Sequence, residues 1–305
     1  MRTRWAIALT GALLIAGCGA SASPSASALA PSASALAPSA SAQATTPAAS
    51  PAPAVASGGA LASGGALASV PAGGVRITFE ESAQVELLSP AGQRVLVDVA
   101  DPGRLTSPAT TDDILLTTHA HDDHWNPLWA NTFPGTMLTF ETGSLEREDV
   151  HITGIAAAHN QGDPFLPKDG SDYIFVIDVA GMRVVHFGDL GQDALTPGQM
   201  AAIGRVDIAI SQLGNAISDV DATNRRGFDQ MNQVHPAVLI PTHVDVEVDG
   251  VTVVKLAAST WKTTYTLKPS VTLTRSQLPT STTVLLMGLN AQVYAPIAHL
   301  EQSTW

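Results

Sequence analysis

The sequence predicts an α/β fold in which mixed β-sheets are covered by helices. Strand-type segments dominate the first half of the region 74–305, and further along the chain hydrophobic strands alternate with helical segments. This region holds roughly 230 residues, which is enough for a full hydrophobic core. We therefore expect residues 74–305 to form one folded domain.

Strands are expected first where β-branched and apolar residues cluster between turn signals. Two strands at 76–85 and 94–99 are joined across the turn sequence Ser-Pro-Ala-Gly. An apolar run predicts a short buried strand at 114–117, and another strand-like stretch runs up to His159.

A hairpin follows, in which 173–179 and 183–187 should pair around Ala180-Gly181. A short helix is expected at 197–203, because Thr196 suits the N-cap and a proline occupies the first helical position. The remaining expected elements are a strand at 207–211, a helix at 221–234, a strand at 237–243, and β-rich pieces at 251–256, 262–267 and 282–287.

Residues 19–73 have a different character, since they consist almost entirely of Ser, Ala, Pro, Gly and Leu and carry no charge. Such a segment has too little bulky apolar surface to offset the entropy of ordering it. We expect a disordered tether.

Charge also separates the two parts of the chain. Arg2 and Arg4 are the only charged residues before position 74, so the region 74–305 carries 13 basic against 27 acidic residues, a formal charge of −14. A polyanionic partner needs a basic footprint. Nucleic acid is therefore not an expected partner, whereas a small-molecule substrate is.

Residues 1–18 have the features of a targeting segment. Arg2 and Arg4 precede an apolar run of about a dozen residues, a length that fits a signal-peptide core. The ending Ile-Ala-Gly-Cys resembles a bacterial lipobox, in which the cysteine becomes the lipid-modified first residue of the mature protein. Cys18 is the single cysteine of the chain. We expect lipidation at Cys18, a membrane partner through the lipid anchor, and an extracytoplasmic location in the bacterial cell envelope; a plain secretory signal is the alternative.

The sequence His-Ala-His-Asp-Asp-His at 119–124 places three of nine histidines within six residues, directly after the strand expected at 114–117. Imidazole nitrogens and carboxylate oxygens are ligand types for zinc and related divalent ions. One loop cannot surround a pair of ions alone. His159, Asp189 and His243 each stand where an expected strand ends, so the fold could bring them to the same edge.

This motif matches the H-x-H-x-D-H signature of the metallo-β-lactamase superfamily, and the order of His159, Gly-Asp at 189 and Pro-Thr-His at 243 is similar to that superfamily. The stretches around these residues are most similar to its L-ascorbate-6-phosphate-lactonase-like branch. The resemblance spans about 76–245. It implies a metallohydrolase with the αββα sandwich, in which two mixed β-sheets are flanked by helices.

Carried over by motif, the resemblance implies two divalent ions, with zinc favoured and manganese or iron also suited to the ligands. A hydroxide between the ions would be the nucleophile, its pKa lowered toward ~7, and Asp123 would help to orient it. The substrate would be an ester, a lactone or a phosphodiester. The implied ligands are His119, His121 and His159 for the first ion, Asp123, His124 and His243 for the second, and Asp189 as the bridge between them.

Five further residues are candidates for the site, and four of them have two interpretations each. Glu81 stands where members of the branch often carry a histidine, so it is a candidate substrate contact. Asp98 either hydrogen-bonds the metal loop or ends a strand. His186 either reaches the site or packs in the core, and Trp125 and Trp129 either wall the pocket or pack in the core.

Other functions compete with the hydrolase. A closed zinc site that only stabilises the fold usually takes four ligands, often cysteines, and seven candidates exceed that need. A class B β-lactamase commonly has a cysteine at its second metal. The alternative that we retain is a metal-binding lipoprotein whose degenerate site binds a ligand without turning it over. The isolated histidines are expected to be structural or surface residues, namely His151, His235 and His299.

Overall fold

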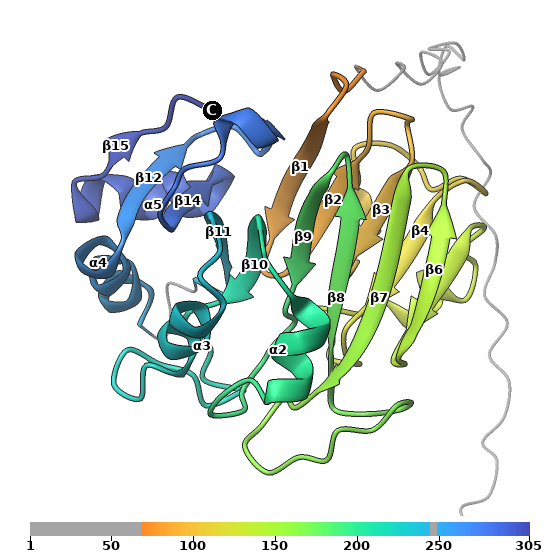
Figure 1. Cartoon of the computed structure of the whole chain (residues 1–305), viewed down its shortest axis with the longest axis horizontal. Coiled ribbons are helices and arrows are strands. Elements are labelled where there is room, and N and C mark those ends of the chain that lie inside the picture. The colour runs from red at the N-terminus through yellow and green to blue at the C-terminus, as the bar shows by residue number, and fades with distance from the viewer. Residues whose placement is uncertain (1–68, 245–248) are drawn as a thin grey trace, which may run out of the picture. The chain divides into compact units, whose positions relative to one another are not determined.

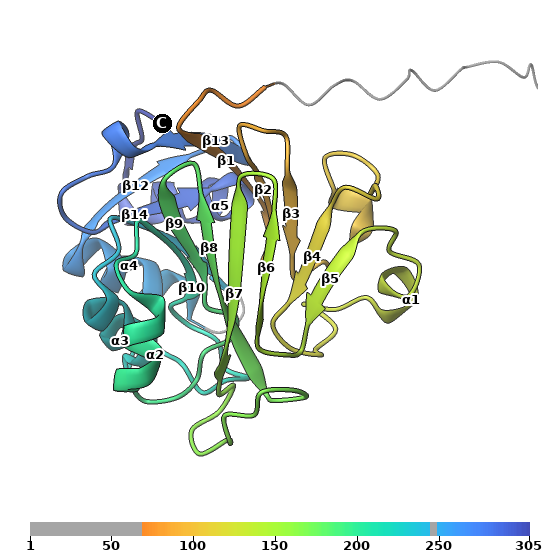
Figure 2. The same cartoon turned by 45° about the vertical axis from the view of Figure 1, so that its right-hand side comes forward.

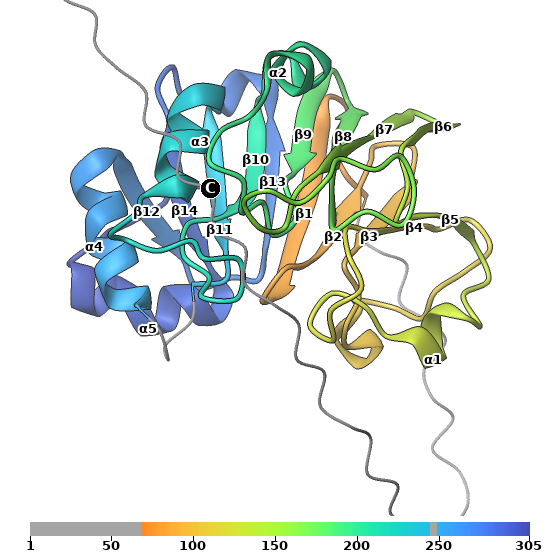
Figure 3. The same cartoon turned by 90° about the horizontal axis from the view of Figure 1, so that it is seen from below.

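The computed structural model describes residues 69–244 and 249–305, so the predicted signal peptide, Cys18 and nearly all of the predicted tether lie outside it. Within the described residues, two mixed β-sheets pack face to face, and Figure 3 shows their two rows of strands. The predicted α/β class with two mixed sheets is confirmed. Across the described ranges, every helix is too short or too polar to span a bilayer.

The first sheet has six strands in the order β13-β1-β2-β3-β4-β5. β3, β4 and β5 pair in parallel, while the other neighbours are antiparallel. Its strands are β1 (Gly74–Glu81), β2 (Gln84–Leu88), β3 (Arg94–Val97), β4 (Ile114–Thr117), β5 (Thr136–Thr139) and β13 (Ser270–Thr274).

The second sheet has nine strands in the order β15-β12-β14-β11-β10-β9-β8-β7-β6. The run from β6 to β9 is antiparallel, and the neighbours from β9 through to β15 are parallel. Its strands are β6 (Gly143–Arg147), β7 (Val150–Ala157), β8 (Asp172–Val179), β9 (Met182–His186), β10 (Ile208–Gln212), β11 (Val238–Thr242), β12 (Lys262–Thr266), β14 (Thr283–Met287) and β15 (Glu301–Gln302).

Helices cover the two outer faces unequally. Beside the nine-stranded sheet lie α2, α3 and α4, as Figure 1 shows, together with α5, which packs on β12 and β14 and also contacts β1. The outer face of the six-stranded sheet carries the one-turn α1 (Figure 2). The helices are α1 (Pro127–Ala130), α2 (Pro197–Ile203), α3 (Arg226–Val234), α4 (Gly250–Thr260) and α5 (Gly288–Ala298), and the 3-10 turns are η1 (Pro102–Arg104) and η2 (Arg275–Gln277).

The core follows from side chains alternating across each strand. In β8, Tyr173 and Phe175 point into the space between the sheets, whereas Ile174 and Val176 pack under the helices. The inner strands β8 and β10 are apolar on both faces because both faces are covered. Such continuous apolar sequences are what predicts these strands.

Most predicted elements are confirmed, including the hairpin of β8 and β9 and the helix α2, where Thr196 and Gln199 form a capping box. The prediction of one strand over 76–85 is wrong. β1 ends at Glu81 and β2 begins at Gln84, and the turn between them holds Ser82 in the left-handed region with φ 52°.

Two further predictions need correction at helices. The helix expected from 221 begins at Arg226, because the Asp221 carboxylate accepts hydrogen bonds from the backbone amides of Thr223 and Asn224 and holds a turn instead. The piece 251–256, predicted to be β-rich, lies inside α4. Its β-branched residues favoured a strand in sequence, and packing of the helix overrides that preference.

Candidate metal centre

The seven candidate ligands follow the ends of four strands. The loop after β4 carries four of them, and the segments that follow β7, β9 and β11 carry one each. Because β9, β10 and β11 run in parallel, the ends of β9 and β11 open at the same edge of the sheet. Figure 3 views the molecule from below, the end at which β1, β9 and β10 finish in Figure 1.

The structure brings His119, His121 and His159 together in one cluster that could hold a metal ion. Nε2 of His119 lies 3.1 Å from Nδ1 of His121, and the ring centre of His159 lies 4.9 Å from that of His119. Nε2 of His159 is buried and has no hydrogen-bond partner among the described residues. These nitrogens therefore face a common point.

A second cluster joins Asp123, His124 and His243. The Nε2 atoms of His124 and His243 are 3.1 Å apart, and their rings stack with centres 5.1 Å apart. Oδ2 of Asp123 lies 3.8 Å from each histidine, and its side chain is 51% exposed. This cluster is consequently the side of the site that solvent reaches.

Asp189 lies between the two clusters, with one oxygen toward each. Oδ2 is 3.8 Å from His119 Nε2 and 3.7 Å from His159 Nε2. Oδ1 is 3.3 Å from His124 Nε2 and 2.8 Å from His243 Nε2. Burial alone would raise the pKa of Asp189, but His243 and His124 outweigh it and hold the pKa well below its usual value. Asp189 is thus an anion that faces both histidine groups.

The chemistry of these atoms fits divalent cations. Pairs of imidazole nitrogens face one another at 3.1 Å, a geometry that an ion between the rings would satisfy. Burial and the neighbouring His124 lower the pKa of His119 to about 2, so this ring keeps the neutral form that metal ligation requires. Burial also lowers the pKa of His121.

His124 has a different electrostatic environment. Burial opposes its charged form, but Asp189 and Asp98 raise its pKa well above the usual value. A proton and a metal ion compete for the same nitrogen, so metal binding on this side releases a proton.

Asp98 contacts the ring nitrogen of His124 that does not face Asp189. Its Oδ2 lies 2.8 Å from Nδ1 of His124, and its two oxygens accept hydrogen bonds from the backbone amide and the hydroxyl of Thr118. Burial would raise the pKa of Asp98, yet His124 lowers it below the usual value. A carboxylate in this position fixes the orientation of a ligating ring and increases its basicity.

Four residues that sequence reasoning missed support other candidate ligands. Nδ2 of Asn160 lies 3.0 Å from His159 Nδ1, and Asn215 donates to Asp189 Oδ2 at 2.6 Å. The Ser82 hydroxyl lies 3.4 Å from His243 Nδ1, and Asp172 lies 3.5 Å from His119 Nδ1. In the sequence, Asn160 adjoins a candidate ligand, while the other three become neighbours only through the fold.

Asp172 is fully buried, and both its oxygens lack hydrogen bonds among the described residues. Burial, then Asp189 and Asp98, raise the pKa of Asp172 well above its usual value. Gly188 makes room for it, because a Cβ at this position, whose φ is +57°, would meet Asp172 Oδ1 at 2.3 Å. The glycine before Asp189 is therefore required by the close approach of Asp172.

The structure places the other residues that have two interpretations. His186 is fully buried: Nε2 lies 3.1 Å from the Ala83 carbonyl, and Nδ1 accepts the Gly188 amide and lies 3.8 Å from Oδ2 of Asp98, the carboxylate that contacts His124. Trp125 and Trp129 pack on the outer face of the six-stranded sheet. Neither tryptophan is among the residues that line the hollow beside Asp123 and His243. The Glu81 side chain lies outside the described part of the structure.

A hollow of about 400 Å³ opens next to Asp123 and His243, and we call it the site hollow. Its described walls come from the β1–β2 turn, from the loop that follows β10 and from the start of α4. The residues of the wall that also contact a candidate ligand are Ser82 and Asn215.

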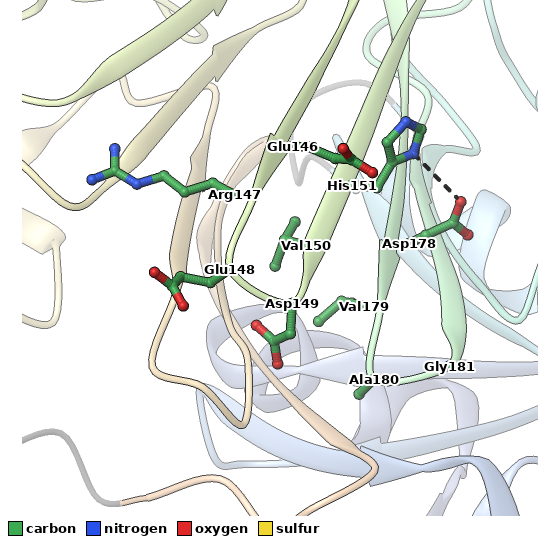
Figure 4. A pocket seen from close by; sticks show the side chains of 10 residues that line it. All are labelled: Glu146, Arg147, Glu148, Asp149, Val150, His151, Asp178, Val179, Ala180 and Gly181. Atoms are coloured by element: carbon green, nitrogen blue, oxygen red, sulfur yellow. Dashed lines mark ion pairs between the residues drawn. The ribbon is translucent and has the colours of Figure 1, made fainter.

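A second hollow, of about 560 Å³, lies at the end of β7 and β8 remote from His159 (Figure 4). Several acidic residues surround His151, whose Nδ1 is 3.9 Å from Asp178 Oδ2. Glu148 and Asp149 belong to the turn between β6 and β7, and Asp149 accepts hydrogen bonds from Ser89 and from the Ala91 amide. These carboxylates do not converge on one point, and the hollow belongs to the outer surface.

The profile of the Beta-lactamase superfamily domain matches residues 76–243, more than half of the chain. A UPF0173 metal-dependent hydrolase from Rubrobacter xylanophilus is 26% identical over 184 residues, which cover 48% of this chain and 72% of that protein.

Two solved structures are also similar. A proposed Zn-dependent hydrolase of the metallo-beta-lactamase superfamily from Thermotoga maritima has a TM-score of 0.51 at 22% identity, covering 70% of this chain and 98% of that chain. A proposed metal-dependent hydrolase from Parabacteroides distasonis has a TM-score of 0.44 at 19% identity, covering 60% and 89%. The Thermotoga structure shows a shared fold. The chain belongs to the beta-lactamase superfamily and has the metallo-β-lactamase fold.

Proposed function

We propose that the protein is a metal-dependent hydrolase that uses two divalent ions to cleave an ester, a lactone or a phosphodiester. A hydrolase of this superfamily accords with the family membership and with the histidine and aspartate clusters. The observation that carries the finer proposal is the position of Asp189, whose two oxygens face two different groups of histidines.

The residues divide between two ions as follows. Nε2 of His119, Nδ1 of His121 and Nε2 of His159 would hold the first ion, with Oδ2 of Asp189. Asp123, His124 and His243 would hold the second, with Oδ1 of Asp189. When bound, such ions act as Lewis acids that acidify water and polarise a carbonyl or phosphoryl oxygen.

The chain itself contributes proton transfer and orientation. Asp123 is the exposed carboxylate at the edge of the site hollow, so its Oδ2 can accept a proton from the attacking water and pass it to the leaving oxygen. The buried Asp98 keeps the ring of His124 aligned, and Asn215 holds the Asp189 carboxylate through a donated hydrogen bond.

We further propose that the enzyme is a lipoprotein of the cell envelope, related to the L-ascorbate-6-phosphate-lactonase-like branch. The sequence features that support an anchor are the positive start, the short apolar run and the single Cys18 before a Ser/Ala/Pro/Gly-rich segment. Mass spectrometry of protein expressed in bacteria would test the anchor. A diacylglyceryl group on Cys18 supports it, and an unmodified or absent Cys18 in the mature chain contradicts it.

Turnover measurements test the hydrolase. The full-length protein, stripped with chelator and reloaded with zinc or manganese, should hydrolyse members of an ester, lactone and phosphodiester panel, and the stripped protein should not. Asp123→Ala should lower kcat by about 10²-fold or more, because a proton acceptor is lost.

The same variant distinguishes an enzyme from a degenerate site. A binding protein would show no turnover in either form, and Asp123→Ala would largely spare its ligand binding. Inactivity of the reloaded wild-type protein toward the whole panel would count against the hydrolase.

A further inference from the structure

The site hollow receives whatever part of a substrate extends beyond its reacting atoms. Asp123 and His243 line one side of it, and Asn215, which donates to Asp189, lines another. At about 400 Å³ it has room for a small organic group. A substrate bound at the metal ligands therefore places its non-reacting group against the other walls.

Those other walls are partly apolar. Val220 and Val253 are almost fully buried, at 1% and 2% exposed, and both line the hollow. Ile217 lines it as well and is 69% exposed. Gly214 lies against Val253, since a Cβ there would meet its Cγ2 at 2.7 Å. The exposed side chain of Ile217 would gain free energy when an alkyl or ring group of the substrate covers it, and the two valines form an apolar floor beneath.

The charges that line the hollow are negative. Besides Asp123, its described lining includes Asp221 and Asp249, and among the described lining residues there is no lysine or arginine. The negative charge of Asp221 stays local, because its carboxylate accepts two backbone amides of the following turn.

Asp249 counteracts a feature of the described lining that would favour an anion, namely the amino-terminal end of α4. It precedes the first residue of α4, whose amino-terminal end carries a partial positive charge. Its side chain makes no capping hydrogen bond to that helix and is exposed, so its charge is directed to the hollow and the solvent. A phosphate or carboxylate on the non-reacting group would meet like charge here, and the described lining offers no lysine or arginine to pair with it.

We propose, building on the hydrolase function above, that the non-reacting group of the substrate is uncharged and partly apolar, as in a neutral carboxylic ester or lactone. A phosphate or carboxylate on this non-reacting group is selected against by the exposed Asp249. In the reaction, the water oxygen forms a bond to the carbonyl carbon and the ester C–O bond breaks. The leaving oxygen takes one water proton and the acid product releases the other, so the step needs no further reactant.

Two matched substrates and two matched variants test this proposal on full-length, zinc-loaded protein. The 4-nitrophenyl monoester of glutaric acid carries a carboxylate at the far end of the acyl chain, and 4-nitrophenyl butyrate is its neutral counterpart. Asp249→Lys reverses one charge in the hollow. Asp229→Lys makes the same change at an exposed position in the first turn of the neighbouring helix α3, outside the hollow.

We expect wild-type protein to favour the butyrate in kcat/KM by about tenfold or more. Asp249→Lys should reduce the preference for the neutral ester at least severalfold, and Asp229→Lys should leave it unchanged. Equal or better turnover of the anionic ester by wild-type protein would overturn the proposal, as would equal effects of the two variants.

A binding experiment that needs no turnover shows whether the charge preference fails, independently of whether the protein is a hydrolase. δ-Valerolactam and 6-oxopiperidine-3-carboxylate share a ring that resembles a lactone and differ in one negative charge. NMR saturation transfer to wild-type protein should be stronger for the neutral lactam, and Asp249→Lys should narrow the difference. If no ester is turned over, the hydrolase function fails while this comparison still decides the charge preference: a stronger signal from the carboxylate would overturn it.

Discussion

Oδ1 of Asp189 lies 2.8 Å from Nε2 of His243, although β10 separates the strands that carry the two residues to the site. The contact depends on β9, β10 and β11 running in parallel, so that β9 and β11 finish at the same edge. Further contacts position both residues: Asn215 donates a hydrogen bond to Oδ2 of Asp189, and the Ser82 hydroxyl lies 3.4 Å from Nδ1 of His243. The site is therefore held from several elements at once, and its supporting residues can be tested one at a time.

Asp98→Asn should weaken metal binding on the side of His124. The substitution keeps the shape but removes the charge that lies 2.8 Å from His124 Nδ1, and loss of such a partner typically costs about 10–100-fold in metal affinity. Titration against a chromophoric chelator measures this. Asp178→Asn, which removes a carboxylate paired with Arg183 away from the site, is the control. Wild-type affinity in Asp98→Asn would contradict the assigned role.

The Ser82 hydroxyl should contribute to the affinity of the site for the second metal ion. Ser82→Ala removes the group 3.4 Å from His243 Nδ1, so we expect roughly tenfold weaker binding of the second ion. Ser82→Gly removes the same hydroxyl and relieves the positive φ of 52°. Both variants should show the same loss of metal affinity in the chelator assay, and only Ser82→Gly should keep or raise Tm. Wild-type affinity in Ser82→Gly would show that the hydroxyl has no part in metal binding.

Stability should fall as the pH rises, because of Glu80. Burial, with Glu86 beside it, raises the pKa of Glu80 from 4.5 to about 9. Between these values the folded state keeps a proton that the unfolded state has released, so Glu80 opposes folding increasingly as pH rises through this window. Glu80→Gln, always neutral, should therefore raise Tm by a few degrees at pH 8.5 and change it little at pH 4.5.

Thermal unfolding followed by circular dichroism measures this difference. Glu146→Gln removes the same charge from an exposed position of β6 and should not show the pH-dependent gain. An equal shift of Tm at both pH values in Glu80→Gln would show that the carboxyl is not protonated in the folded protein.

Much of the fold could be predicted because strands in this protein are short, apolar and separated by turn sequences. β4 and β8 are apolar on both faces, a pattern that only strands covered on both sides allow. The turn at Ser82 was missed because a serine in the left-handed region leaves no glycine or proline as a signal. Residues 251–256 were assigned to a strand from their valines, since only packing against α5 and the sheet reveals the helix.

The candidate ligands could be named from sequence because each follows a strand and four of them share one loop. Their supporting residues could not, with the exception of Asp98. In the sequence, Asp172 merely precedes the strand expected at 173–179, and its proximity to His119 depends on the pairing of β8 with β9 and on the absence of a side chain at Gly188. Asn215 and Ser82 reach the site from loops whose paths depend on the packed core.

The metal content of the purified protein, measured by elemental mass spectrometry after gel filtration, tests the central claim most directly. The account predicts about two equivalents of zinc, manganese or iron per chain. His119→Ala should lose the ion on its own side, and Asp189→Ala should lose metal on both sides, because its two oxygens face both groups of histidines. Two equivalents retained by Asp189→Ala, or no metal bound by wild-type protein after incubation with zinc or manganese, would contradict the binuclear site.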